Sequence, residues 1–253
     1  MSDLHVDVVG TGDPVLLVHG IGGTGNAWGP IVGPLAKVHK LIVPDLAGCG
    51  RSAADKPFGA DDHVNQLVEL LDVHEIETVH VVGHSFGANL SQRLALRLPG
   101  RVRTLALLGG GPGRGTPPSP HPLQVRADRV RAEGLDGVAD DTVKFATAAA
   151  TSAGNPVAAS FVRELVMGQD PENYARTCEA AVNGSPFDSG DITCPTLLLT
   201  GVEDVVTPPG AGKALAAQLP DATLRLLADC GHWPSIERPQ TVAEALLDFF
   251  AAH

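Results

Sequence analysis

Short apolar runs, each bounded by Gly, Pro or Asp, recur along the chain and are separated by stretches in which apolar and polar residues mix at helical spacing. Runs of about four to eight apolar residues are typical of strands buried on both faces. Their alternation with helices is typical of a parallel sheet. Six runs predict strands at 15–19, 40–44, 79–84, 104–109, 196–201 and 223–228, and the alternating residues 4–9 predict one more. We therefore expect an α/β fold with a mostly parallel, doubly wound sheet of about seven strands.

Helical periodicity fills most of the segments between these strands, at 62–74, 88–98, 212–219 and 240–252. The alternation breaks once. After the strand at 104–109 no strand pattern occurs before about Gly190, and a Pro-rich segment at 116–122 leads into helical patterns at 123–133, 138–151, 157–166 and 172–183. We expect a core made of residues 1–111 and 191–253, with a helical insertion at 112–190.

The insertion follows the end of a strand, and in open α/β sheets ligands bind beyond the carboxyl ends of the strands. We therefore expect it to form a cap over an active site. The alternative is a structural appendage without a role in binding.

Length and charge narrow the function classes. The chain has 253 residues, enough for one large α/β domain, and its 29 acidic against 18 basic residues give a formal net charge of −11. This balance argues against nucleic-acid and anionic membrane partners, which need a basic footprint, and leaves small molecules. No apolar run approaches about 18 residues, and the start lacks the basic-then-apolar pattern of a secretion signal, so we expect a cytoplasmic location. The sequence pattern leaves the oligomeric state open.

One serine lies between two glycines directly after the strand expected at 79–84, in Gly83-His84-Ser85-Phe86-Gly87. A serine on a sharp strand-to-helix turn has a strained backbone, and bulk two residues to either side would collide with the neighbouring strand and helix. The motif alone is weak evidence for catalysis, because glycine and serine are common residues. A serine hydroxyl becomes a good nucleophile only beside a base that a third group orients, so such partners have to be found.

Partners for Ser85 are expected at the ends of later strands. His232 follows the last strand, in a loop where Gly231 allows the backbone to approach the site closely. The loop after the strand at 196–201 contains Glu203 and Asp204. We expect the orienting acid in this loop, because the loop after the strand at 104–109 offers no carboxylate. We select Asp204 as this acid, with Glu203 as the fallback.

The order of Ser85, Asp204 and His232, together with the sheet and the insertion, resembles the α/β-hydrolase family over nearly the whole chain. The turn at 19–23 (HGIGG), the loop at 45–52 (DLAGCGRS) and the segment at 231–233 (GHW) match the same family. The resemblance departs in two places: only one strand precedes His19, and Ala88 stands where many relatives carry glycine.

The resemblance implies acyl transfer, with Ser85 as nucleophile, His232 as base and Asp204 as the group that orients it. It also implies an oxyanion hole formed by the backbone N–H groups of Ile21 and Phe86. No metal and no organic cofactor are expected. Three other residues of the matching segments are expected to hold loops rather than to contact substrate: His19, Asp45 and Arg51.

The substrate is less closely specified. The serine motif and residues 92–108 look most like enol-lactonases and carboxylesterases, which favours cleavage of a carboxylic ester or lactone of a small, largely apolar substrate. Residues 230–233 look like carbon–carbon bond hydrolases, which place an arginine over a carboxylated substrate. The alternatives are therefore a carbon–carbon hydrolase of a vinylogous diketone acid, a cofactor-free perhydrolase or haloperoxidase-like enzyme, and, outside enzymes, a hydrolase-fold ligand receptor.

Five side chains are candidates for substrate contact: Trp28, Phe161, Arg163, Arg176 and Trp233. For the two arginines a solvated helix face is the competing interpretation. The apolar residues of the insertion either line a pocket or dock the insertion onto the core, and periodicity does not separate these alternatives.

Overall fold

The computed structural model describes residues 4–53, 58–113 and 121–253, so most of the Pro-rich segment expected at 116–122 lies outside the described part. Seven strands form one sheet in the order β1-β3-β2-β4-β5-β6-β7. The strands are β1 (Val6–Val9), β2 (Asp13–Val18), β3 (His39–Pro44), β4 (Val79–His84), β5 (Val102–Leu108), β6 (Thr196–Gly201) and β7 (Ala222–Leu227). β1 runs antiparallel to β3 and every other pair is parallel. The mostly parallel, doubly wound α/β sheet is confirmed.

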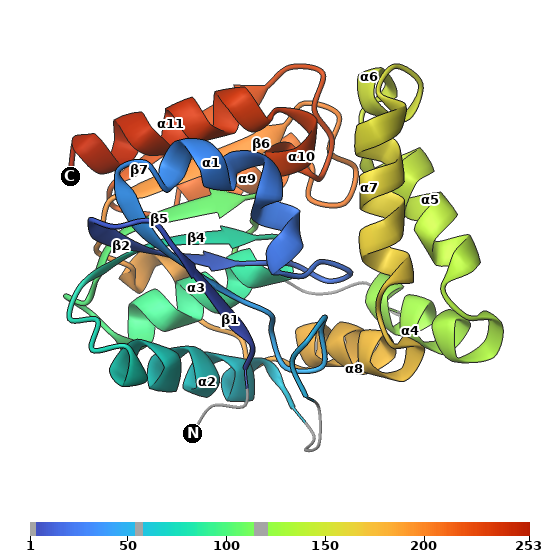
Figure 1. Cartoon of the computed structure of the whole chain (residues 1–253), viewed down its shortest axis with the longest axis horizontal. Helices are drawn as coiled ribbons and strands as arrows, with labels where there is room; N and C mark the ends of the chain where they lie inside the picture. Colours follow the sequence, from blue (N-terminus) through green and yellow to red (C-terminus); the bar gives the residue numbers. More distant parts are fainter. Residues whose placement is uncertain (1–3, 54–57, 114–120) are drawn as a thin grey trace.

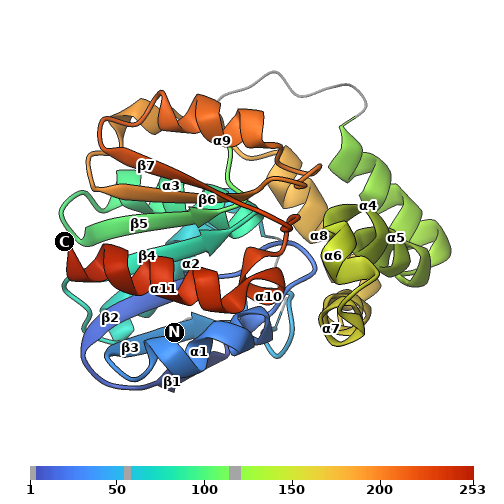
Figure 2. The same cartoon turned by 90° about the horizontal axis from the view of Figure 1, so that it is seen from above.

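Helices cover both faces of the sheet (Figure 1, Figure 2). The core helices are α1 (Gly29–Leu35), α2 (Ala60–Val73), α3 (Phe86–Arg97), α9 (Pro209–Ala216), α10 (Pro234–Glu237) and α11 (Pro239–Ala251). α1 and α11 share a buried cluster on one face, and α2, α3 and α9 share another on the opposite face. Successive residues of β2 alternate between the two clusters, as the pleat of a strand requires. The periodicity did not predict α1, because its sequence GPIVGPL is rich in weak helix formers.

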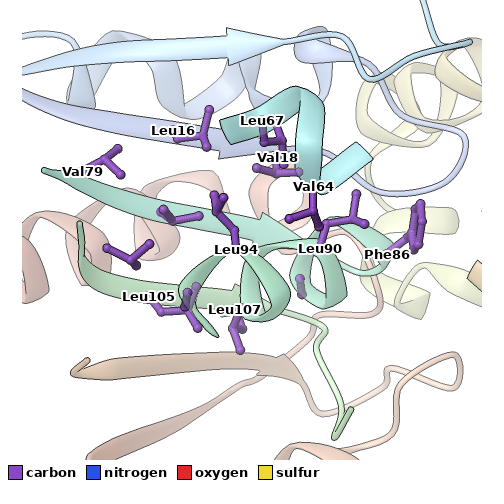
Figure 3. Packing of buried hydrophobic residues seen from close by; sticks show 14 of the residues in the cluster. Leu16, Val18, Val64, Leu67, Val79, Phe86, Leu90, Leu94, Leu105 and Leu107 are labelled. Carbon is purple, nitrogen blue, oxygen red and sulfur yellow. The ribbon is translucent and has the colours of Figure 1, made fainter. Parts of the chain in front are cut away.

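Helix α3 is anchored along its length, and this anchoring fixes the turn that precedes it. Leu90 and Leu94 of α3 lie fully buried in one cluster with Val64 and Leu67 of α2 and with Leu107 of β5 (Figure 3). Truncation of one such buried leucine to alanine costs about 2–5 kcal/mol of folding free energy. The residue at the start of α3 therefore cannot shift without disturbing this packing.

The segment between β5 and β6 forms a separate helical layer beyond the carboxyl ends of the parallel strands (Figure 1, Figure 2). Its helices are α4 (Pro122–Glu133), α5 (Asp136–Ala146), α6 (Ala149–Ser152), α7 (Pro156–Met167) and α8 (Pro171–Val182). The 3-10 turn η2 (Ser189–Asp191) follows against the core, where the Ser189 hydroxyl donates to Gln92 of α3. Apolar residues of α4, α5, α7 and α8 form a core of their own. Ala158 and Val162 of α7 pack instead against Trp233 and Ile236, which docks this layer onto the sheet domain.

One helix of this layer differs from its sequence pattern. The periodicity predicts a single helix over 138–151, but Thr147 and Ala148 are extended and separate α5 from α6. The Ala146 carbonyl accepts from the His232 N–H, and the Ala148 N–H donates to the Glu237 carboxylate. Backbone groups at the break are therefore hydrogen-bonded to the core domain.

Within the described residues, no helix combines the length and the apolar character that crossing a bilayer requires.

Candidate active site

Ser85 occupies the turn between β4 and α3 with φ 53° and ψ −115°, a conformation that costs a non-glycine residue about 1–3 kcal/mol. The flanking glycines make this turn possible. A Cβ on Gly83 would lie 2.4 Å from the Gly87 carbonyl oxygen, and one on Gly87 would lie 2.2 Å from the carbonyl oxygen of Val18 in β2. The collisions expected from the sequence are thus present on both sides, with the helix and with the neighbouring strand.

A continuous chain of hydrogen bonds joins Ser85, His232 and Asp204. His232 Nε2 lies 2.8 Å from Ser85 Oγ, and its Nδ1 lies 2.8 Å from Asp204 Oδ2. Because a carboxylate only accepts, Nδ1–H donates to Asp204 and Nε2 is left to accept from the Ser85 hydroxyl. Asp204 is 2% exposed, and its other oxygen accepts from the N–H groups of Val206 and Thr207. This arrangement orients a base beside a half-buried hydroxyl.

Glu203, the fallback acid, lies elsewhere. Its side chain is exposed and accepts from the Ala149 N–H of the helical layer.

The loop that carries His232 is held by two buried side chains. His84 Nε2 lies 2.5 Å from the His232 carbonyl oxygen, to which it donates, and its ring packs against the rings of His232 and Trp233. Burial lowers the pKa of His84 to about 3, so the ring is neutral at ordinary pH. Glu237 accepts from the N–H groups of Gly231 and Trp233 through one oxygen.

The other oxygen of Glu237 accepts from the Ala148 N–H and the Thr151 hydroxyl, both in the helical layer. One carboxylate, 5% exposed, therefore joins the His232 loop to the layer above it. A Cβ on Gly231 would lie 2.7 Å from the Ala148 nitrogen, so only glycine allows this approach.

The HGIGG turn after β2 is fixed from below by His19, which is fully buried. Its Nε2 accepts from the Leu46 N–H, which leaves Nδ1–H to donate to the Gly20 carbonyl oxygen. Burial lowers the pKa of His19, in keeping with this neutral form.

Asp45 and Arg51 hold the adjacent loop. Asp45 accepts from the N–H groups of Gly25 and Arg51 and from Arg51 Nε, and Arg51 also pairs with Asp7. Burial acts to raise the pKa of Asp45, but these hydrogen bonds outweigh it and hold the pKa below its usual range. The geometry of these residues is that of loop support.

The two amides expected for an oxyanion hole lie beside Ser85. Ile21 and Phe86 both line the cavity that contains the Ser85 side chain. Within the described residues neither of their backbone N–H groups has a hydrogen-bond acceptor. Phe86 is the first residue of α3, where the helix dipole adds partial positive charge.

A cavity of about 600 Å³ lies between Ser85 and the helical layer, and His232 lines it as well. Its lining comes from both sides: Ile21, Phe86 and Trp233 belong to the sheet domain, whereas Leu123 and Ala146 belong to the layer. Most of the lining is apolar, so the site suits a largely apolar ligand beside a reactive hydroxyl.

The five candidates for substrate contact separate in the structure. Trp233 lines the cavity. Trp28 is 1% exposed and packs in the core with α1 and α11. Phe161 borders a different surface depression together with Val9 and Val43.

The two arginines also lie outside the cavity lining. Arg163 pairs with Asp136 and Asp140 on α5, and Arg176 lies over the Phe58 ring with its guanidinium donating to Asn173. Both therefore contact protein groups rather than the space above Ser85.

Other polar residues line the cavity without having been selected from the sequence: Asn89, Arg126, Thr142, Tyr174 and Thr207. Three of them belong to helices of the layer. The face that such a helix turns toward the sheet depends on how the layer docks onto the sheet domain. Periodicity gives the helix but not its rotation about the sheet. Within the described ranges, no group of three or more His, Cys, Asp or Glu side chains is placed to hold a metal ion.

Comparisons with known proteins agree with this architecture. A family model described as the alpha/beta hydrolase fold matches residues 13–239. A pimeloyl-[acyl-carrier protein] methyl ester esterase of Chromobacterium violaceum is 31% identical, over 97% of this chain and 97% of its own length. A 2-hydroxy-6-oxo-2,4-heptadienoate hydrolase of Pseudomonas putida is 30% identical, over 96% of this chain and 91% of its own.

The solved structure of the enol-lactonase from Burkholderia xenovorans LB400 matches with a TM-score of 0.91 at 26% identity, covering 98% of this chain and 96% of that one. The residues that the family model matches make up the greater part of the sequence and include the serine turn. The chain therefore belongs to the α/β-hydrolase fold family.

Proposed function

We propose that this protein is a serine hydrolase that cleaves a carboxylic ester or lactone through an acyl-enzyme on Ser85. The observation that carries the proposal is the hydrogen-bond chain from Ser85 through His232 to Asp204, with the hydroxyl facing a largely apolar cavity. An esterase and an enol-lactonase are among the similar proteins. The substrate is expected to be small and largely apolar.

In the proposed reaction, His232 Nε2 takes the hydroxyl proton as Ser85 Oγ attacks the carbonyl carbon. Asp204 stabilises the imidazolium and keeps Nδ1 protonated. The tetrahedral intermediate collapses when His232 returns the proton to the leaving alkoxide, which departs as an alcohol or, for a lactone, remains attached as a hydroxyl. His232 then takes a proton from water, the hydroxide attacks the acyl-enzyme, and the acid leaves as Ser85 regains its proton.

The N–H groups of Ile21 and Phe86 are proposed to stabilise the negative charge that develops on the oxygen of the tetrahedral intermediate. Their position on the cavity wall and their lack of an acceptor among the described residues support this role. Preorganised donors of this kind lower the barrier because they need no rearrangement as charge develops.

The layer at 112–190 is proposed to act as a cap. It contributes Leu123, Thr142, Ala146 and Tyr174 to the cavity wall, which shields the reacting groups from bulk water. Water exclusion strengthens the electrostatic contacts on which the mechanism depends.

The proposal is tested with short-chain 4-nitrophenyl esters and a serine-reactive fluorophosphonate. Wild-type protein is expected to hydrolyse the esters and to be labelled on Ser85, and Ser85→Ala to lose both properties. Ser160→Ala removes an exposed serine of α7 and serves as the matched control. No turnover by the wild type and no label on Ser85 would contradict the proposal.

Carbon–carbon bond hydrolysis is the second candidate, because the similar Pseudomonas putida protein carries the name of a 2-hydroxy-6-oxo-2,4-heptadienoate hydrolase. A lactone panel compared with vinylogous diketone acids separates the two reactions. Higher kcat/KM on the diketone acids would replace the ester or lactone assignment.

A further inference from the structure

The cavity above Ser85 contains one permanently charged side chain in its described lining, Arg126 of α4. No Asp, Glu or Lys belongs to that lining. The whole chain carries 29 acidic residues and only 18 basic ones, so an acid-free wall with an arginine runs against the overall composition. α4 lies in the layer beyond the carboxyl ends of the strands (Figure 1).

Arg126 is half-buried, and no acidic side chain of the described residues forms an ion pair with it. Five other half-buried arginines each pair with a carboxylate, and Arg176 instead donates to Asn173 and lies over the Phe58 ring. The five are Arg93, Arg101, Arg129, Arg163 and Arg238. A guanidinium partly withdrawn from water beside apolar surface is stabilised by an anion that accepts its hydrogen bonds. The described lining of this cavity supplies none, so the anion would come from the ligand.

The Tyr174 hydroxyl adds a second donor on the same wall. Tyr174 belongs to α8, is 2% exposed, lines the cavity and lies close enough to Arg126 to be influenced by its charge. Burial raises the pKa of Tyr174 to about 12, against the opposing influence of Arg126, so the phenol keeps its proton. A carboxylate accepts hydrogen bonds at both oxygens and donates none, which fits a pair of donors.

We propose that Arg126 and Tyr174 form an anion subsite that binds a free carboxylate of the substrate while its ester or lactone carbonyl lies at Ser85. This inference rests on the proposed function and narrows its substrate class to half-esters of dicarboxylic acids and to lactones that bear a carboxylate. The largely apolar lining of the cavity fits a hydrocarbon linker. The planar fork of arginine matches the two oxygens of a carboxylate.

The hydrolysis test uses two esters of nearly identical shape, 4-nitrophenyl hydrogen adipate and its primary amide, 4-nitrophenyl adipamate. Wild-type kcat/KM is expected to be about 10- to 100-fold higher for the carboxylate, the range given by a hydrogen bond to a charged group. Arg126→Met is expected to bring the ratio to within about twofold of one, and Arg126→Lys to keep part of it. Arg129→Met removes the same charge from the same helix, outside the cavity lining, and is expected to keep the full ratio.

A binding measurement separates this inference from the proposed function. Ser85→Ala is titrated by calorimetry with monomethyl adipate and with methyl adipamate, and about tenfold tighter binding of the acid is expected. Ser85→Ala combined with Arg126→Met is expected to lose the preference. If neither nitrophenyl ester is hydrolysed but the binding preference and its loss are observed, the subsite stands and the proposed reaction fails. If both esters are hydrolysed at equal efficiency, or if the ratio survives Arg126→Met, the subsite is overturned.

Discussion

The backbone N–H of His232 donates to the carbonyl oxygen of Ala146 at 2.7 Å. This bond joins the loop that carries the proposed base to the last residue of α5 in the helical layer. A carbonyl at the end of a helix has no partner within the helix and is free to accept from elsewhere. The position of the base is therefore coupled to the docking of the layer, and several variants test how this coupling and the site chemistry work.

The choice of Asp204 over Glu203 is tested by removing each charge in turn. Asp204→Asn is expected to lower kcat by roughly 10⁴-fold, because an amide in this place favours the wrong tautomer of the imidazole. Glu203→Gln changes the neighbouring exposed carboxylate and is expected to leave kcat within about threefold of wild type, since surface substitutions have small effects. Steady-state kinetics on a nitrophenyl ester measures both. A larger loss in Glu203→Gln than in Asp204→Asn would reverse the assignment.

Glu237 is predicted to hold the His232 loop and the layer together. Glu237→Gln replaces an acceptor oxygen by an NH₂ group, so two of the four donors around this side chain lose their partner. Buried unsatisfied donors cost about 1–3 kcal/mol each, so the loss of two partners is expected to lower the free energy of unfolding by about 2–6 kcal/mol. Urea unfolding measures the change. Glu244→Gln on the exposed side of α11 is the control, and equal midpoints for the two variants would speak against the bridge.

The serine turn is predicted to tolerate no side chain at Gly87. Gly87→Ala would place its Cβ 2.2 Å from the Val18 carbonyl oxygen and 2.5 Å from that of His19, which forces β2 and α3 apart. We expect loss of esterase activity and a lower melting temperature. Gly33→Ala lies in α1 with nothing within 4 Å of the added Cβ, and it is expected to stabilise the helix by about 0.5–1 kcal/mol. Wild-type activity and melting temperature in Gly87→Ala would refute the steric account.

Stability is predicted to fall on mild acidification. Burial lowers the pKa of His63 and His80 to about 4 and that of His84 to about 3. In the unfolded chain these residues titrate near pH 6.5, so between about pH 6.5 and pH 4 the unfolded state binds protons that the folded state does not. The free energy of unfolding therefore decreases as pH is lowered through this window, with a slope approaching about 1.4 kcal/mol per pH unit for each histidine.

Urea unfolding at several values between pH 7.5 and pH 4.5 measures this slope. His63→Phe places an apolar ring beside Phe58 and Phe86 and is expected to reduce the slope by about one proton. His253→Gln at the exposed carboxyl terminus is the control. An unchanged slope in His63→Phe would show that His63 titrates alike in both states.

The sheet and the serine turn could be predicted because their causes are local. A strand buried on both faces has to be a short apolar run, and all seven expected strands lie within two residues of the observed ones. The turn at Ser85 requires glycine on both sides for steric reasons that are visible in the motif itself. The chain order of Ser85, Asp204 and His232 placed all three after strands, and parallel strands end at one edge of the sheet.

The contacts of the helical layer could not be predicted in the same way. Trp28 and Trp233 are both buried aromatic residues, yet only Trp233 lines the cavity, because Trp28 packs into the core with α1 and α11. Arg163 and Arg126 are both arginines on helices of the insertion, and only Arg126 lines the cavity. The difference is the rotation and docking of each helix.

By itself, the sequence determined the α/β class, the strand positions, the site of the insertion and the serine, acid and histidine segments, since each follows from short-range sterics or from hydrophobic periodicity. Only the tertiary structure decided that Glu237 and Ala146 bind the His232 loop to the layer, that the helix expected over 138–151 breaks at Thr147, and that Arg126 lines the cavity. These features depend on contacts between segments far apart in the chain, and such contacts form only when the layer docks on the sheet.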